Sequence, residues 1–128
     1  MRIGLTSVYV DDQERARRFY TDVLGLRLKD DVPSGAAERW LTVVSPEDPA
    51  GPELVLKRAD APARASQRAN RERGRPVLSF ATADCQGEDA RPAARGVVFA
   101  LAPTRVAYGG TDAVFDDGCG NLVTRHQA

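Results

Sequence analysis

The clearest hydrophobic pattern in the chain lies between residues 12 and 25. Apolar side chains recur there at the spacing of one helical face, at Ala16, Phe19, Tyr20, Val23 and Leu24. Asp12 is a typical N-cap residue, Glu14 suits the positive end of the helix dipole, and Gly25 supplies a left-handed C-terminal cap. We therefore predict a helix from Asp12 to Leu24.

Shorter apolar runs predict strands around this helix. The first strand runs from Leu5 to Val10, and its alternation sends one set of side chains, Ile3, Leu5, Ser7 and Tyr9, to one face and Thr6, Val8 and Val10 to the other. Runs bounded by Pro and Gly turns predict three more strands, at Leu26 to Asp30, Glu38 to Ser45 and Glu53 to Arg58. The Ala- and Arg-rich segment from Ala61 to Arg73 has no β-branched residue and ends at Gly74, so we predict a surface helix there.

The second half of the chain repeats this pattern less regularly. A strand from Arg75 to Ala83 is followed by Asp84 and a helical segment that contains Gly87 and Pro92. Because proline breaks helical hydrogen bonding, we expect this helix to be short, kinked or restarted near Pro92. Three further strands are predicted, at Val97 to Ala102, Arg105 to Phe115 with an interruption at Gly109-Gly110, and Asn121 to His126.

Four landmarks recur in the same order in both halves at a nearly constant spacing. They are the Asp after the first strand (Asp12 and Asp84), the Gly after the helix (Gly25 and Gly96), and both ends of a D-x-x-G turn (residues 48–51 and 117–120). Such self-similarity indicates a tandem repeat. We predict one domain of α+β class made of two βαβββ modules, at about 1–58 and 75–127, joined by the helix at about 61–73.

Composition narrows the functional classes. Lys plus Arg and Asp plus Glu both number 18, so the net charge is zero and nothing draws the chain to nucleic acid. No apolar run is long enough to span a membrane, and the N-terminus leads directly into strand-like sequence, so we expect a cytoplasmic protein without a membrane partner. Cys85 and Cys119 are too few for a disulfide framework and are interpreted as reduced, structural thiols. A single histidine, His126, excludes most sites that need several imidazoles from one chain.

Both ends of the chain resemble the vicinal-oxygen-chelate superfamily of glyoxalase I, bleomycin-resistance proteins and extradiol dioxygenases. The resemblance rests on the string from Leu5 to Asp12, on Phe19-Tyr20 and Leu24-Gly25-Leu26, and on the closing segment from Val114 to Leu122, where a D-P-x-G-N-x-x-E pattern is usual. It spans residues 2 to 127. The resemblance implies a curled mixed sheet that forms a cup, with helices outside and the ligand inside, and it implies a homodimer. Pairing of modules within one chain and swapping between chains both stay open.

The same resemblance places four metal ligands, usually His, Gln or Glu. Carried over residue by residue, they fall on Leu5 and Val77 in the first strands and on Val55 and Thr124 in the last strands. Three aliphatic side chains and a threonine lack the donors that a divalent ion needs. Neighbouring positions on the same faces offer only a mixed set, Ser7, Ser79, Glu53, Lys57 and His126. We therefore expect no metal and no other cofactor, which removes the family's usual Lewis-acid chemistry.

These observations favour a metal-free protein that binds a small organic molecule, of sequestration or resistance type. The candidate cavity residues are Leu5, Ser7, Tyr9, Trp40, Val55, Val77, Ser79, Tyr108, Thr124 and His126. One alternative is an enzyme of lyase, isomerase or dioxygenase type, with misplaced metal ligands or with His126, Tyr9 or Tyr108 in acid–base roles. Another is a non-catalytic dimeric interaction module whose cup is filled by side chains. For His126 the competing interpretation is an ordinary histidine near a frayed C-terminus.

Overall fold

The two halves of the chain have the same order of elements. The first contains β1 (Leu5–Val10), α1 (Gln13–Arg18), a π-helical turn η1 (Phe19–Val23), β2 (Arg27–Pro33), β3 (Arg39–Val44) and β4 (Glu53–Arg58), followed by α2 (Ala61–Glu72). The second contains β5 (Leu78–Ala81), α3 (Cys85–Asp89), β6 (Phe99–Arg105), β7 (Thr111–Asp116) and β8 (Leu122–Gln127). This computed structural model describes residues 1–89 and 96–128. The predicted helix restart near Pro92 lies outside the described residues.

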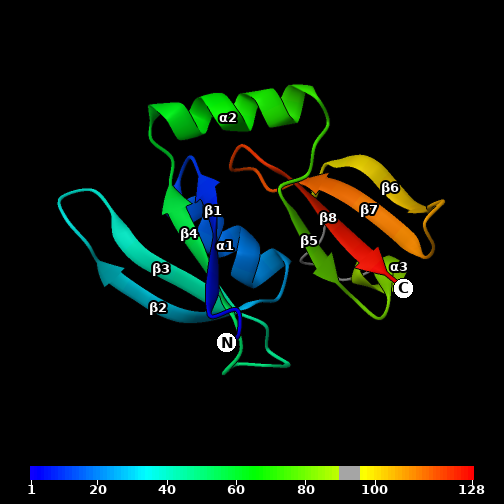
Figure 1. Cartoon of the computed structure of the whole chain (residues 1–128), viewed down its shortest axis with the longest axis horizontal. Coiled ribbons are helices and arrows are strands. Elements are labelled where there is room, and N and C mark those ends of the chain that lie inside the picture. The colour runs from blue at the N-terminus through cyan, green and yellow to red at the C-terminus, as the bar shows by residue number, and fades with distance from the viewer. Residues whose placement is uncertain (90–95) are drawn as a thin grey trace. The chain divides into compact units, whose positions relative to one another are not determined.

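Each half forms its own four-stranded mixed sheet (Figure 1). The strand orders are β1-β4-β3-β2 and β5-β8-β7-β6. In both sheets the first strand runs parallel to the last, and the remaining pairs are antiparallel. The predicted α+β class and the tandem βαβββ repeat are therefore confirmed. The chain divides into unit 1, Met1–Ala65, and unit 2, Ser66–Ala128, with the division inside α2.

The landmark aspartates of the repeat cap equivalent helices. The side chain of Asp12 accepts a hydrogen bond from the Arg15 amide at 2.9 Å, and that of Asp84 accepts one from the Gly87 amide at 2.8 Å. A Cβ added to Gly87 would lie 2.0 Å from the Asp84 carboxylate. Gly87, which weakens the helical pattern in the sequence, is thus the residue that lets Asp84 fold over the first turn of α3.

The helix predicted from Asp12 to Leu24 changes its hydrogen bonding halfway. After Arg18 it becomes η1, where the Leu24 amide donates to the Phe19 carbonyl at 3.0 Å, five residues back. The Thr21 hydroxyl donates to the Arg17 carbonyl at 2.6 Å and so competes for an acceptor of the α-helical ladder. Gly25, with φ of 80°, ends the segment in the predicted left-handed conformation.

The core of unit 1 lies between its sheet and α1–η1. Val8 and Val10 of β1 are buried on this side, and α1 contacts β3 and β4 and contributes Ala16, with Tyr20 buried in η1. The alternation predicted for the first strand is correct: Val8 and Val10 face the helix, whereas Leu5, Ser7 and Tyr9 are exposed. In unit 2, α3 contacts β7 and β8 in the same way, over the buried Ala113, Phe115 and Val123.

One predicted strand is wrong. The segment from Arg105 to Phe115 is not a single strand with an interruption; residues 106–110 form the turn of a hairpin between β6 and β7. The Val106 amide donates to the Gly110 carbonyl at 3.1 Å, and Gly109 and Gly110 have φ of 103° and 83°. The two glycines are the turn itself because only glycine adopts such φ values readily.

Both cysteines are buried free thiols, as expected for structural residues. Cys119 sits in the second D-x-x-G turn, where its amide donates to the Asp117 carboxylate at 2.7 Å. Among the described residues, no helix combines the length and the apolar content that crossing a membrane requires.

Candidate functional site

Five of the predicted cavity residues share one face of the unit 1 sheet. The β1–β4 register pairs Ser7 with Val55, and the β3–β4 register pairs Thr42 with Val55. Because side chains two residues apart on a strand point the same way, Leu5 and Tyr9 join Ser7, and Trp40 joins Thr42. We call this side, away from α1, the open face of unit 1.

The open face of unit 1 is apolar and aromatic. The exposed fractions are 51% for Leu5, 41% for Tyr9, 41% for Trp40 and 52% for Val32, which lies opposite Trp40 on β2. Val55, by contrast, is buried in the floor of this face. Exposed apolar and aromatic groups gathered on one side of a rigid sheet are typical of a surface that binds a ligand or a partner.

Two charged residues of β4 on this face, Glu53 and Lys57, have partners. The Glu53 carboxylate accepts a hydrogen bond from the Thr42 hydroxyl at 3.0 Å and pairs with the Lys29 ammonium at 3.4 Å. The Lys57 ammonium lies 6.0 Å from the centre of the Tyr9 ring. These contacts hold Glu53 and Lys57 in place. A ligand on this face would therefore meet mainly the exposed rings of Tyr9 and Trp40.

Four more predicted residues share the corresponding face of unit 2. The registers place Ser79, Thr124 and Val114 in one row across β5, β8 and β7, and Ala81, His126 and Asp112 in the next row. Val77 precedes Ser79 and donates its amide to the Leu122 carbonyl at 2.9 Å. We call this side, away from α3, the open face of unit 2. Its hydroxyls and imidazole make it more polar than the open face of unit 1.

A hydrogen-bonded cluster connects the last predicted residue, Tyr108, to this face. Asp112, which is buried, lies with its carboxylate 2.6 Å from the His126 Nδ1 atom, and its second oxygen accepts a hydrogen bond from the Tyr108 hydroxyl. The Tyr108 and His126 rings are stacked with their centres 6.0 Å apart. The structure thus brings Tyr108 and His126 together through Asp112, a residue that the sequence analysis did not select.

The backbone of Gly110 lies next to this cluster and leaves no room for a side chain. A Cβ at this position would lie 2.9 Å from the His126 Cε1 atom and 2.2 Å from the Gln127 carbonyl oxygen. Gly110 therefore lets the β6–β7 turn approach the end of β8, which brings Tyr108 within reach of Asp112. The missed signal in the sequence is an acidic residue, Asp112, directly before the apolar run Ala113-Val114-Phe115 of β7.

The residues at the implied metal positions do not fit a divalent ion. Val55 lies beside Ser7, Thr124 lies beside Ser79, and Leu5 lies beside a glutamate that Thr42 and Lys29 already occupy. Throughout residues 1–89 and 96–128, no three His, Cys, Asp or Glu side chains converge. A stable divalent site needs several such donors in one place.

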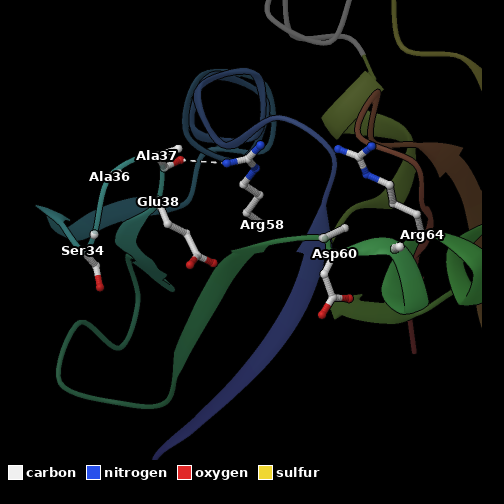
Figure 2. Close-up of a pocket in the computed structure, with 10 residues that line it drawn as sticks. Ser34, Ala36, Ala37, Glu38, Arg58, Asp60 and Arg64 are labelled. Atoms are coloured by element: carbon white, nitrogen blue, oxygen red, sulfur yellow. Dashed lines mark hydrogen bonds between the residues drawn. The ribbon is translucent and has the colours of Figure 1, made fainter.

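A separate hollow of about 510 Å³ lies in unit 1 and contains none of the predicted site residues. The β2–β3 loop, residues 34–38, lines one side, and the segment from Arg58 to Arg64 lines the other. Figure 2 shows Arg58 reaching across it to donate a hydrogen bond to the Ala37 carbonyl at 3.2 Å. Its remaining charged side chains have both signs, Glu38, Asp60 and Arg64, so the hollow has no single charge preference.

The largest resolved pKa change lies away from both open faces. Hydrogen bonds from Arg17 and then Arg39 lower the pKa of the Glu14 carboxyl to about 2. Burial raises the pKa of Asp116, but the hydrogen bonds from Arg71 and from the Gly118 amide outweigh it and lower the pKa overall. Both carboxylates form ion pairs that join structural elements. Glu14 joins α1 to β3 through Arg39, and Asp116 joins the end of β7 to α2 through Arg71.

Comparisons with known proteins agree with this architecture. The family model for the Glyoxalase/Bleomycin resistance protein/Dioxygenase superfamily matches residues 2–124. The uncharacterised protein YurT of Bacillus subtilis (strain 168) is 44% identical over 124 residues, covering 96% of this chain and 96% of that protein.

Two solved structures are similar over nearly their whole length. The crystal structure of UcmS2 has a TM-score of 0.81 and 26% identity, covering 100% of this chain and 98% of that one. The crystal structure of TnmS3, described as an antibiotic binding protein from Streptomyces sp. CB03234, has a TM-score of 0.76 and 30% identity, covering 99% of this chain and 95% of that one.

Proposed function

Because the chain belongs to the glyoxalase/bleomycin resistance protein/dioxygenase superfamily, we propose that it is a metal-free protein that binds a small organic molecule on an open sheet face. The observation that carries this proposal is the set of exposed apolar and aromatic side chains, Leu5, Tyr9, Val32 and Trp40, on a sheet face that no helix of unit 1 covers. The likeness to TnmS3 supports the same class of function.

The exposed side chains contribute to binding in different ways, through apolar burial, stacking and hydrogen bonding. Burial of the exposed parts of Trp40, Tyr9 and Leu5 by a ligand removes apolar area from water, which is worth about 25 cal/mol per Å² before the costs of association. Trp and Tyr also offer flat surfaces for stacking on an aromatic ligand. The open face of unit 2, taken by itself, supplies hydrogen-bonding groups, Ser79, Thr124 and His126, that could orient a ligand bound there.

The single tryptophan gives a direct test. Because Trp40 is the only Trp in the chain and lies on the open face of unit 1, its fluorescence reports binding there. We would titrate the protein with a panel of aromatic compounds selected by thermal shift. Saturable changes in Trp40 emission are expected, and Tyr9→Ala should weaken the affinity about tenfold, since it removes one stacking ring.

Leu28→Ala is the matched control. Leu28 is 40% exposed, an exposed fraction similar to the 41% of Tyr9. It lies opposite Val43, whose side chain is buried on the face that α1 covers, so Leu28 is not on the open face. This variant should leave the affinity unchanged. Equal losses for Tyr9→Ala and Leu28→Ala would contradict binding on the open face, and the absence of any binding compound would favour an interaction module.

We also propose that the protein is a homodimer, since an apolar surface of this kind is well suited to be shared or shielded by a second copy. Light scattering on the eluting protein should give twice the 13.8 kDa mass of the chain. A mass of one chain at micromolar concentration would contradict the dimer and leave the proposed binding face untouched.

A further inference from the structure

We propose that His126 recognises the ligand by accepting a hydrogen bond at its Nε2 atom, which selects aromatic molecules with a weakly acidic hydroxyl group. This inference rests on the proposed binding function and assigns a ligand class to the open face of unit 2. It is carried by the geometry of the cluster that Tyr108, Asp112 and His126 form.

The first step is the tautomer of the imidazole. A carboxylate only accepts hydrogen bonds, and the Asp112 carboxylate lies 2.6 Å from Nδ1 while also accepting one from the Tyr108 hydroxyl. Nδ1 must therefore carry a hydrogen, so whenever the ring is neutral its lone pair lies on Nε2. Asp112 is thus a positioning residue, and Nε2 is the acceptor.

The second step is accessibility. The Asp112 side chain is only 8% exposed, whereas that of His126 is 30% exposed. Over the described part of the chain, the bond to Asp112 is the only hydrogen bond of the His126 ring. Nε2 is therefore the acceptor that the cluster offers to a ligand on the open face of unit 2.

The third step is preorganisation. Tyr108 stacks on the imidazole at an angle of 27° between the rings, and the bare backbone of Gly110 lies against the Cε1 edge. Figure 1 shows the β6–β7 turn beside the end of β8. A ring held on three sides binds without losing much rotational freedom, so its acceptor geometry is fixed before the ligand arrives.

The fourth step is the choice of ligand. A fixed neutral acceptor favours a strong neutral donor, and a phenolic hydroxyl is a stronger donor than an alcohol because its proton is more acidic. The Tyr108 side chain, which is 75% exposed, adds an aromatic surface next to the acceptor. A hydroxyl attached to a flat aromatic ring satisfies both groups at once, since the ring stacks while the hydroxyl donates.

The test uses two probes that differ in one group, 1-naphthol and 1-methoxynaphthalene. His126 is the only histidine, so its ring signals in ¹⁵N-edited NMR are unambiguous and report both binding and tautomer. At a pH where the ring of the free protein is neutral, its hydrogen should be on Nδ1. The wild type should bind 1-naphthol about fivefold more tightly than the methyl ether, the factor expected for one net hydrogen bond.

Two variants separate positioning from direct contact. His126→Phe keeps a flat ring without an acceptor, so both probes should bind with equal affinity. Asp112→Asn allows the amide to donate to Nδ1, which moves the ring hydrogen to Nε2 and should abolish the preference together with a change of tautomer in the spectrum. Gln86→Ala, at an exposed position of α3 on the opposite side of this sheet, is the control and should keep the fivefold preference.

Several outcomes would overturn the inference. These are equal affinities for the two probes in the wild type, a neutral free ring with its hydrogen on Nε2, or a preference that Gln86→Ala removes and His126→Phe keeps. If neither naphthalene binds while other compounds do, the ligand class is wrong and the proposed function stands. If no compound in the thermal-shift panel binds, the proposed function itself fails.

Discussion

At the scale of single residues, a buried amide holds the helix of unit 1 to its sheet. Gln13 donates from Nε2 to the Arg39 and Leu56 carbonyls at 2.8 and 2.9 Å, and its Oε1 accepts from the Arg39 amide at 3.2 Å. Gln13 lies in the first turn of α1, so it joins that helix to β3 and β4. The hydrophobic pattern does not reveal it, because a glutamine at the start of a helix is usually exposed.

Removal of this amide should destabilise unit 1 measurably. Gln13→Ala leaves the two carbonyls and the Arg39 amide without their partner, which should lower the free energy of unfolding by roughly 2 kcal/mol. Urea unfolding followed by Trp40 fluorescence measures this change in the same unit. The control is Arg18→Ala at an exposed position of α1, expected to cost less than about 0.5 kcal/mol. Equal small losses in the two variants would contradict the assigned role of Gln13.

The Glu14 carboxylate makes the stability of unit 1 dependent on pH. Its pKa is lowered from 4.5 to about 2 in the folded protein by Arg17 and Arg39. The stabilisation is therefore present above pH 4.5 and is lost as the pH falls from 4.5 through about 2. Because the group is exposed, solvent screens this contribution, and we expect a small effect.

The measurement compares Glu14→Gln with the wild type in urea at pH 7 and at pH 2. The variant should be less stable at pH 7, and the difference should disappear at pH 2, where the wild-type carboxylate becomes protonated. Glu47→Gln, which removes an exposed loop carboxylate without an ion pair among the described residues, accounts for the general effect of a lost surface charge. A difference that persists unchanged at pH 2 would rule out this linkage.

At the scale of elements, alternation along the strands predicts which face each side chain occupies. The sequence therefore placed Leu5, Ser7 and Tyr9 on one face and Val8 and Val10 on the other, as the structure has them. The tandem βαβββ order was also predictable, since both modules carry the same capping and turn residues. These features are encoded by neighbours within a few positions of each other in the chain.

The cluster around His126 was not predictable in the same way. It depends on a contact between the β6–β7 turn and the end of β8, whereas the sequence predicted one strand from Arg105 to Phe115 with only an interruption at Gly109-Gly110. A single strand over these residues would not predict that Tyr108, in a turn, lies near Asp112 and His126. The pairing of Asp112 with His126 follows from the β7–β8 register, which depends on the geometry of the turn between these strands as well as on the hydrophobic pattern.

Two neighbouring glycines in the β6–β7 turn differ in what surrounds them. Gly109 and Gly110 both have positive φ, so an alanine at either position should cost about 1–2 kcal/mol. Only Gly110→Ala also places a Cβ 2.2 Å from the Gln127 carbonyl oxygen; at Gly109 the space is open. Gly110→Ala should therefore exceed Gly109→Ala by at least about 1 kcal/mol, since backbone must move to relieve the overlap.

Urea unfolding followed by circular dichroism measures this pair, and the His126 ring signals report whether the cluster is disturbed. Those signals should shift in Gly110→Ala and stay in place in Gly109→Ala. Equal destabilisation by both alanines, with unchanged ring signals, would show that the turn does not depend on the close approach at Gly110.

At the scale of the whole molecule, a fold whose relatives include enzymes presents faces suited to binding. The positions implied for metal ligands are occupied by Leu5, Val55, Val77 and Thr124, and the described residues supply no replacement set of donors. What each unit offers instead is a rigid sheet face, apolar and aromatic in unit 1 and hydrogen-bonding in unit 2. Such faces recognise a molecule by shape, stacking and a few polar contacts.

The most direct test of the central claim is native mass spectrometry of gently purified protein, combined with elemental analysis of the same sample. We expect chains that retain a small organic molecule and hold far less than one divalent ion per chain. The organic mass should be lost in the double variant Tyr9→Ala/Trp40→Ala and kept in Leu28→Ala. One equivalent of divalent metal per chain, removed by a chelator together with the bound molecule, would contradict the account.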